Sequence, residues 1–155
     1  GKARFREAAL FTHKGLSGPA ILQISSYWRH REAVAIDFVP DQPADWLLAF
    51  KRATPRATLR SALSSMPARL ADTLAERLAL DRELGNLPDA QLRTAAQRLH
   101  AWPFHPTGTE GFAKAEVTAG GISTADLSSQ SMAARRVPGL YAIGEAVDVT
   151  GWLGG

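Results

Sequence analysis

This sequence of 155 residues contains no cysteine. Disulfides, thiolate zinc sites and cysteine nucleophiles are therefore excluded, and the absence is typical of a cytoplasmic protein. No apolar run approaches the roughly 20 residues that span a bilayer, so no membrane partner is expected. The sequence also lacks an initial methionine and a secretory signal peptide. We therefore expect it to be a piece of a larger protein.

Several short catalytic and binding motifs are also missing. No Gly-x-Gly-x-x-Gly occurs, so the phosphate cradle of a complete dinucleotide-binding domain is absent. The histidines His13, His30, His100 and His105 show no metal-ligand spacing, and no metal site is expected. Ser17 lies in Leu-Ser-Gly rather than Gly-x-Ser-x-Gly, and it suits a helix cap better than a nucleophile. Alone, the chain does not contain a whole active site.

The charge of the chain is slightly positive, with 18 Lys and Arg against 15 Asp and Glu. Arginine outnumbers lysine, and acids are interleaved with the arginines between residues 52 and 98. Interleaved signs are typical of solvated helix faces with ion pairs one turn apart, whereas a nucleic-acid surface more often gathers one sign on one face. Nucleic acid is therefore expected to be an unlikely partner. A helical module that binds nucleic acid or a protein partner stays open as the alternative.

The first 40 residues indicate two strands and a helix. Residues 5–11 predict a strand, and a loop over residues 12–19 leads to a helix over about 19–28. Pro19 suits the first helical position, where its missing N–H would be unpaired in any case. Residues 33–39 alternate between apolar and polar side chains, which is a strand signature.

The middle of the chain indicates a block of helices. Apolar side chains recur at helical spacing over residues 43–53, 55–64, 67–80 and 88–102, and a proline stands at the start of each range. The apolar stripes of these helices are expected to form a core rather than a cofactor box.

The last third of the chain predicts extended segments at residues 103–107 and 113–118, and then a sharp break at Gly120 and Gly121. After a Pro-Gly turn, residues 140–143 form a short apolar run that predicts a buried strand.

A glycine and two acids follow this predicted strand. Gly144 would let backbone approach a ligand closely, and the carboxylates of Glu145 and Asp148 can accept hydrogen bonds from ribityl or sugar hydroxyls. The alternative is an ordinary polar loop at the end of a strand, because short motifs of glycine and acid are common.

These elements together predict an α+β fold. A β-rich lobe of mixed or antiparallel strands is expected over residues 1–40 and 102–136, with a helical subdomain of about four helices inserted at 41–101. Residues 137–155 are expected to supply a terminal strand and glycine loop.

Three segments in this order resemble one family, the YhiN/BaiN-like bacterial FAD-dependent oxidoreductases. They are residues 10–22 (LFTHKGLSGPAIL), 107–122 (TGTEGFAKAEVTAGGI) and 137–148 (VPGLYAIGEAVD). The resemblance implies a flavoprotein whose FAD domain carries an inserted β-rich lobe, with a helical subdomain inserted in turn into that lobe. This chain would then be the inserted module with the last strand of an incomplete FAD domain, and its first partner would be the remainder of that domain.

The resemblance also implies roles for particular residues. Gly144, Glu145 and Asp148 would lie against the ribityl and pyrophosphate part of FAD, and Gly154 and Gly155 would begin a turn near the flavin ring.

Two candidate catalytic positions come from the inserted lobe. His13 and the turn from Thr118 to Gly121 would face the flavin, although His13 also suits a simple tight turn before a helix. The implied activity is hydride transfer from NAD(P)H through FAD to an electron-poor small molecule, such as a conjugated ketone. The fragment alone is not expected to hold FAD tightly or to be active.

Overall fold

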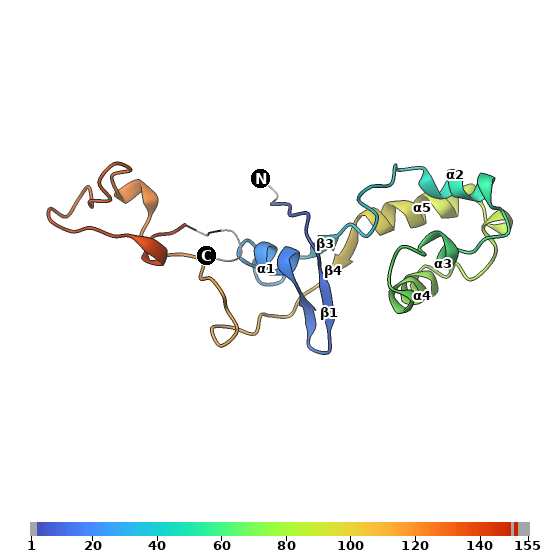
Figure 1. The fold of residues 1–155 in the computed structure, drawn as a ribbon, viewed down its shortest axis with the longest axis horizontal. Helices are drawn as coiled ribbons and strands as arrows, with labels where there is room; N and C mark the ends of the chain where they lie inside the picture. The colour runs from blue at the N-terminus through green and yellow to red at the C-terminus, as the bar shows by residue number, and fades with distance from the viewer. Residues whose placement is uncertain (1–2, 150, 152–155) are drawn as a thin grey trace. The chain divides into compact units, whose positions relative to one another are not determined.

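The structure is a computed structural model that describes residues 3–149 and 151. These residues form an α+β fold with five α-helices and two small antiparallel sheets, which confirms the predicted fold class. The chain divides into two compact units (Figure 1). The first unit comprises Gly1–Glu32 and Pro106–Gly155, and the second, which we call the helical unit, comprises Ala33–His105.

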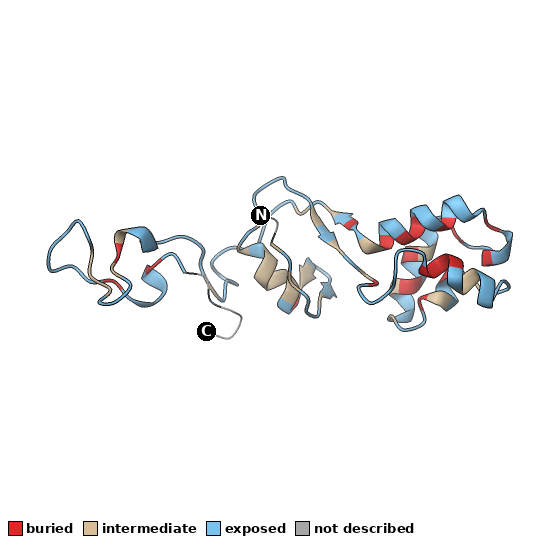
Figure 2. Ribbon diagram, turned by 90° about the horizontal axis from the view of Figure 1, so that it is seen from above, coloured by how far each residue is buried: buried red, intermediate tan, exposed pale blue. Residues whose placement is uncertain are grey.

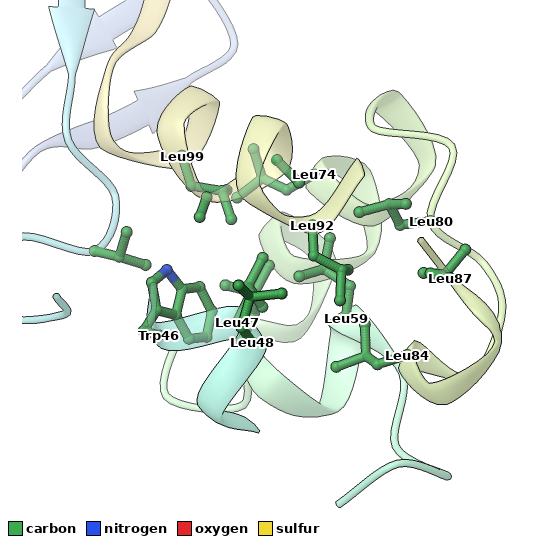
Figure 3. Packing of buried hydrophobic residues seen from close by; sticks show 14 of the residues in the cluster. Trp46, Leu47, Leu48, Leu59, Leu74, Leu80, Leu84, Leu87, Leu92 and Leu99 are labelled. Carbon is green, nitrogen blue, oxygen red and sulfur yellow. The ribbon is translucent and has the colours of Figure 1, made fainter. Parts of the chain in front are cut away.

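The helical unit is built around one apolar core. Sixteen buried apolar residues form a single cluster in it (Figures 2 and 3). The helix α5 contributes a stripe with helical spacing, so burial of one face explains why the segment is helical. The predicted core is thereby confirmed. The elements are α2 (Trp46–Ala53), α3 (Leu59–Ala62), α4 (Ala68–Arg77), the 3₁₀ helix η1 (Leu84–Asn86) and α5 (Asp89–His100).

The helices begin later than their prolines. Pro67 and Pro88 have extended backbone at the N-cap, with ψ of 131° and 141°, so each helix starts one residue afterwards. The predicted start of α3 at Pro55 is wrong, because residues 55–57 pair with η1 instead. The N–H of Gly85 donates to the Pro55 carbonyl, with N and O 2.7 Å apart. The α3 helix begins after Thr58, whose hydroxyl accepts from the N–H of Ser61.

The end of α4 has the hydrogen bonds of a Schellman motif. The Leu80 N–H donates to the Ala75 carbonyl, and the Ala79 N–H donates to the Glu76 carbonyl. Ala79 takes the left-handed position with φ 53°, where glycine is the usual residue. This turn directs Leu80 into the core, where it is 1% exposed.

Two short strands flank the helices. Strand β3 (Val34–Ile36) pairs antiparallel with β4 (Trp102–Phe104), with Val34 opposite Phe104 and Ile36 opposite Trp102. The helical unit therefore encloses the predicted helical subdomain 41–101 together with one strand on each side.

The first unit begins with a β-hairpin. Strands β1 (Leu10–Thr12) and β2 (Gly15–Ser17) are antiparallel, with Thr12 opposite Gly15, and α1 (Pro19–Ser25) follows. The predicted strand over residues 5–11 thus starts only at Leu10, and the predicted loop over 12–19 is mostly hairpin. Pro19 stands at the first helical position, as predicted.

The rest of the first unit consists of turns, isolated bridges and two 3₁₀ helices, η2 (Thr124–Asp126) and η3 (Gly144–Ala146). Its buried apolar cluster contains Leu127, Ala142 and Val147.

The prediction of a buried strand at residues 140–143 is wrong for this structure. Tyr141 makes one isolated bridge, to Ala133, and is 64% exposed, while Ile143 is 73% exposed. Among the described residues this run is paired with residues 132–134, where the Ala134 N–H donates to the Leu140 carbonyl and the Ala142 N–H donates to the Met132 carbonyl. This short pairing leaves Tyr141 and Ile143 exposed. The predicted extended segment 113–118 is also wrong, because Lys114 and Ala115 donate their N–H groups to the Gly111 carbonyl in a turn.

Candidate cofactor-binding site

The candidate site centres on η3, where Gly144 and Glu145 stand. Gly144 has φ +68°, a left-handed conformation that favours glycine, and a Cβ placed there would meet no atom within 4 Å. The side chain of Glu145 is exposed in the first turn of η3. The backbone at Gly144 is therefore accessible, and the neighbouring Glu145 presents an exposed carboxylate that can accept hydrogen bonds from the hydroxyl groups of a ligand.

Asp148 is already engaged within the protein. Its Oδ1 accepts a hydrogen bond from the N–H of Gly120, with N and O 3.1 Å apart. This bond joins the turn that contains Thr118 to the loop that contains η3, although 28 residues separate its two partners. The structure thus brings together two of the predicted site segments.

Backbone pairing reinforces this junction. The Ile122 N–H donates to the Ala146 carbonyl and the Asp148 N–H donates to the Ile122 carbonyl, each with N and O 2.8 Å apart. Ile122 and Val147 form a parallel bridge. We call residues 120–122 with residues 146–148 the glycine clasp.

Gly121 makes the clasp possible. A Cβ at this position would lie 2.7 Å from the Ala146 carbonyl oxygen and 3.0 Å from the carbonyl carbon of Val147, and its φ is +137°. Gly120 also has positive φ, +96°, but a Cβ there would meet nothing within 4 Å. The sequence predicts only a sharp break of the chain at Gly120 and Gly121. It does not reveal the close backbone contact of Gly121, because Ala146 lies 25 positions further along the chain.

His13 lies elsewhere in the first unit, at the tip of the β1–β2 hairpin. The Thr12 hydroxyl accepts from the N–H groups of Lys14 and Gly15, which closes the tip. The prediction that His13 stands just before a helix N-terminus is wrong, because β2 and Gly18 intervene before α1.

The hairpin tip carries an ion pair that sequence reasoning missed. Lys14 Nζ lies 2.9 Å from Glu110 Oε1. The hydrogen bond from Lys14 lowers the pKa of Glu110, and the charges of Lys14, Lys114 and His13 lower it further. His13 therefore lies close to a paired carboxylate and far along the chain from the clasp.

The residues near η3 fit one part of FAD. Glu145 can accept from ribityl or ribose hydroxyls, and the open face of Gly144 leaves room for the ligand. Asp148 keeps its second carboxylate oxygen for such a contact, while its first oxygen is held by Gly120. The predicted site residues Gly154 and Gly155 lie outside the described residues.

The described part of the chain has neither a metal-binding cluster nor a membrane-spanning helix. No group of three or more His, Asp and Glu side chains there could hold a metal ion. No helix within residues 3–149 is long and apolar enough to cross a membrane.

Comparison with known proteins gives a family match and three curated relatives. The model of a family described as the HI0933-like protein barrel and H2TH domain matches residues 1–117. A ribosomal RNA dihydrouridine synthase of Escherichia coli (strain K12) is 49% identical over 97% of this chain. The protein of that name from Haemophilus influenzae is 41% identical over 97% of the chain. A 3-dehydro-bile acid delta(4,6)-reductase of Clostridium scindens is 31% identical over 93% of the chain.

The chain spans 38% of the length of each of these relatives. Their names describe oxidoreductase-type enzymes, one kind acting on ribosomal RNA and the other on a bile acid.

Proposed function

This chain belongs to the HI0933-like barrel and H2TH domain family, and from that premise we propose that it is the substrate-facing module of a flavin-dependent reductase that acts on uridine in ribosomal RNA. The observation that carries the proposal is 49% identity over 97% of the chain to a ribosomal RNA dihydrouridine synthase. Identity to the bile-acid reductase is lower, 31%. The charge pattern made nucleic acid an unlikely partner, and we propose an RNA substrate instead because of the similarity to that synthase.

Uracil fits the electron-poor acceptor that the family resemblance implies. Its C5=C6 bond is conjugated with the C4 carbonyl, so a hydride adds at C6 and a proton adds at C5. The balanced reaction converts uridine, NAD(P)H and a proton into dihydrouridine and NAD(P)⁺. FAD, when bound, accepts the hydride from NAD(P)H and passes it to the substrate.

The residues of this chain would position the cofactor and shape its surroundings. Gly144 and Glu145 would contact the ribityl and pyrophosphate part, and the glycine clasp would hold their loop in place. Protonation of C5 requires a general acid, which is either a side chain or a water molecule bound by one. The two candidates remain Thr118, which stands two residues before Gly120 of the clasp, and His13, which stands at the hairpin tip.

A second candidate function is reduction of a conjugated ketone in a small molecule. The relative from Clostridium scindens supports it, and the same hydride chemistry would serve. The two candidates differ in substrate and not in the roles of Gly144, Glu145 and the clasp.

The test uses the full-length parent protein. We expect it to purify with flavin absorbance bands and to oxidise NAD(P)H. Ribosomal RNA from cells that lack its gene should lose a dihydrouridine, which mass spectrometry of digested RNA would detect, and the wild-type gene should restore it. An unchanged dihydrouridine content with full flavin loading would favour the small-molecule candidate. A colourless protein that takes up no FAD would overturn both.

Within that protein, Glu145→Ala should reduce flavin retention and leave the fold intact. The matched control is Glu116→Ala, which removes another exposed carboxylate of the first unit. Equal flavin content in both variants and the wild type would remove Glu145 from the site.

A further inference from the structure

We propose that one end of the helical unit is the surface on which the RNA backbone docks. This basic end consists of Lys51 and Arg52 at the end of α2, Arg56 in the following loop, Arg82 before η1 and Arg93 on α5. The proposal rests on the proposed function, because it supplies the site through which a ribosomal RNA substrate would be held.

Packing of α2 against α5 brings the first group of cations together. Lys51 Nζ donates to the Leu87 carbonyl at 2.7 Å and to Asp89 Oδ1 at 2.8 Å, which fixes the last turn of α2 to the start of α5. The charges of Arg93 and Arg52 reach the same carboxylate and help Lys51 to lower the pKa of Asp89. Three cations from two helices therefore surround one acid.

A second pairing brings Arg56 and Arg82 to this end. The Leu84 N–H donates to the Ala57 carbonyl, with N and O 2.8 Å apart, and the isolated bridge between Thr58 and Glu83 lies beside it.

Gly85 fixes this pairing, because a Cβ there would lie 2.8 Å from the Pro55 carbonyl oxygen. The end of α2, η1 and the start of α5 lie at the same end of the helical unit (Figure 1). The arginines thus stand on a fixed framework rather than on free loops.

Charge is distributed unevenly over the helical unit. The two segments that carry the basic end, residues 51–56 and 81–93, contain five cations and three acids. One of these acids, Asp89, is neutralised by Lys51. The remainder of the unit outside α3 and α4, residues 33–50 and 94–105, has three aspartates and one arginine. With His neutral, the net charge is thus +2 over the segments of the basic end, +1 over residues 57–80 and −2 over residues 33–50 and 94–105.

The four arginines of the basic end are free to bind a partner. All four are exposed, and none forms a salt bridge with an Asp or Glu in the part of the chain that the structure describes. By contrast, Arg60 pairs with Asp72 at 2.7 Å, and Arg98 lies over the ring of Trp102.

Guanidinium groups bind phosphate through two parallel hydrogen bonds, which suits the repeated phosphates of RNA better than a scattered acidic protein surface. RNA is therefore the partner that the charge and chemistry of this end favour.

The experiment compares two double variants of the full-length protein. Arg52→Gln/Arg93→Gln removes two charges from the basic end. Arg69→Gln/Arg77→Gln removes two exposed charges from α4, outside it. Binding to protein-free ribosomal RNA would be measured by filter binding over a series of KCl concentrations. Flavin content and melting temperature would verify that both variants fold.

We expect the basic-end variant to bind ribosomal RNA at least fivefold more weakly and the α4 variant to stay within about twofold of the wild type. The slope of log affinity against log salt should fall by about 1.5 in the basic-end variant alone, since each lost phosphate contact removes about 0.7–0.9 from it. Equal losses in both variants, or no loss in either, would overturn the proposal, as would a basic end that binds an acidic protein while RNA affinity is unchanged.

Failure of this proposal and failure of the proposed function are distinguishable. A parent protein that makes dihydrouridine, with a basic-end variant that binds RNA like the wild type, overturns only the docking surface. A parent protein that makes no dihydrouridine and binds no ribosomal RNA overturns both.

Discussion

The helical unit and the first unit bury apolar side chains to very different degrees (Figure 2). The helical unit encloses sixteen buried apolar residues in one cluster, whereas the cluster of the first unit has three. The first unit instead exposes large apolar side chains, among them Phe112, Tyr141 and Ile143. The helical unit therefore completes its own core, while the first unit presents exposed apolar surface of the kind that packs against another part of a protein.

The largest effect is expected from removing a core side chain of the helical unit. Leu92 on α5 is 0% exposed, and Leu92→Ala should lower the free energy of unfolding by about 3 kcal/mol, because it leaves a cavity in a closed core. Urea unfolding of the 155-residue chain followed by circular dichroism at 222 nm would measure this loss.

The matched substitution in the first unit is Ile143→Ala. Ile143 is 73% exposed, so the same measurement should change by less than about 0.5 kcal/mol. Similar losses for both variants would contradict the contrast between the two units.

The glycine clasp offers a test within the first unit. Gly121→Ala should cost about 2 kcal/mol locally, because the Cβ would meet the Ala146 carbonyl and the backbone would be strained. Gly120→Ala adds backbone strain but no close contact, so its cost should be smaller. Hydrogen exchange of the Ile122 and Asp148 amides, both of which donate within the clasp, would report the loss. Equal exchange in the two variants would show that steric contact at Gly121 is unimportant.

One substitution is expected to stabilise the helical unit. Ala79→Gly should raise its free energy of unfolding by about 1 kcal/mol, because Ala79 occupies the left-handed position of the Schellman motif. Urea unfolding gives the value, and Ala75→Gly within α4 is the control, which should destabilise by a similar amount. A loss of stability on Ala79→Gly would mean that the entropy of glycine outweighs the relief of strain.

The smallest effects concern one ion pair in each unit. Pairing with Lys14 lowers the pKa of Glu110, and pairing with Lys51 lowers the pKa of Asp89. Each carboxylate therefore contributes stability above its unfolded-state pKa, and that contribution is lost as the pH falls through the lower, folded-state pKa.

Titration by nuclear magnetic resonance should show this directly. Lys14→Gln should raise the pKa of Glu110 toward its usual range without moving that of Asp89, and Lys51→Gln should do the reverse. Both carboxylates are exposed, so thermal stability should change little. An unchanged pKa of Glu110 in Lys14→Gln would mean that this pair does not form in solution.

The sequence predicted the helical unit well because its signals are local. The spacing of Leu92, Ala95, Ala96 and Leu99 reports one buried face of α5, and proline marks each helix start to within a few residues. The start of α3 was missed because the backbone of residues 55–57 is used by η1, about 30 residues away.

The candidate site was less predictable because it depends on distant partners. The sequence and the family resemblance predicted Gly144, Glu145 and Asp148 as site residues, but they could not show that Asp148 accepts from Gly120 or that Lys14 pairs with Glu110. Residues 140–143 have a strand-like composition, yet composition cannot supply the neighbouring strands that would bury them.

The β3–β4 ladder has a consequence for how this protein can change. Because Val34 lies opposite Phe104, the chain enters and leaves the helical unit one strand spacing apart, about 5 Å. A segment whose ends meet in this way can be exchanged for another, or replaced by a tight turn, with little disturbance to the chain on either side. The helical unit is therefore a self-contained insertion whose sequence can vary without altering the course of the chain outside it.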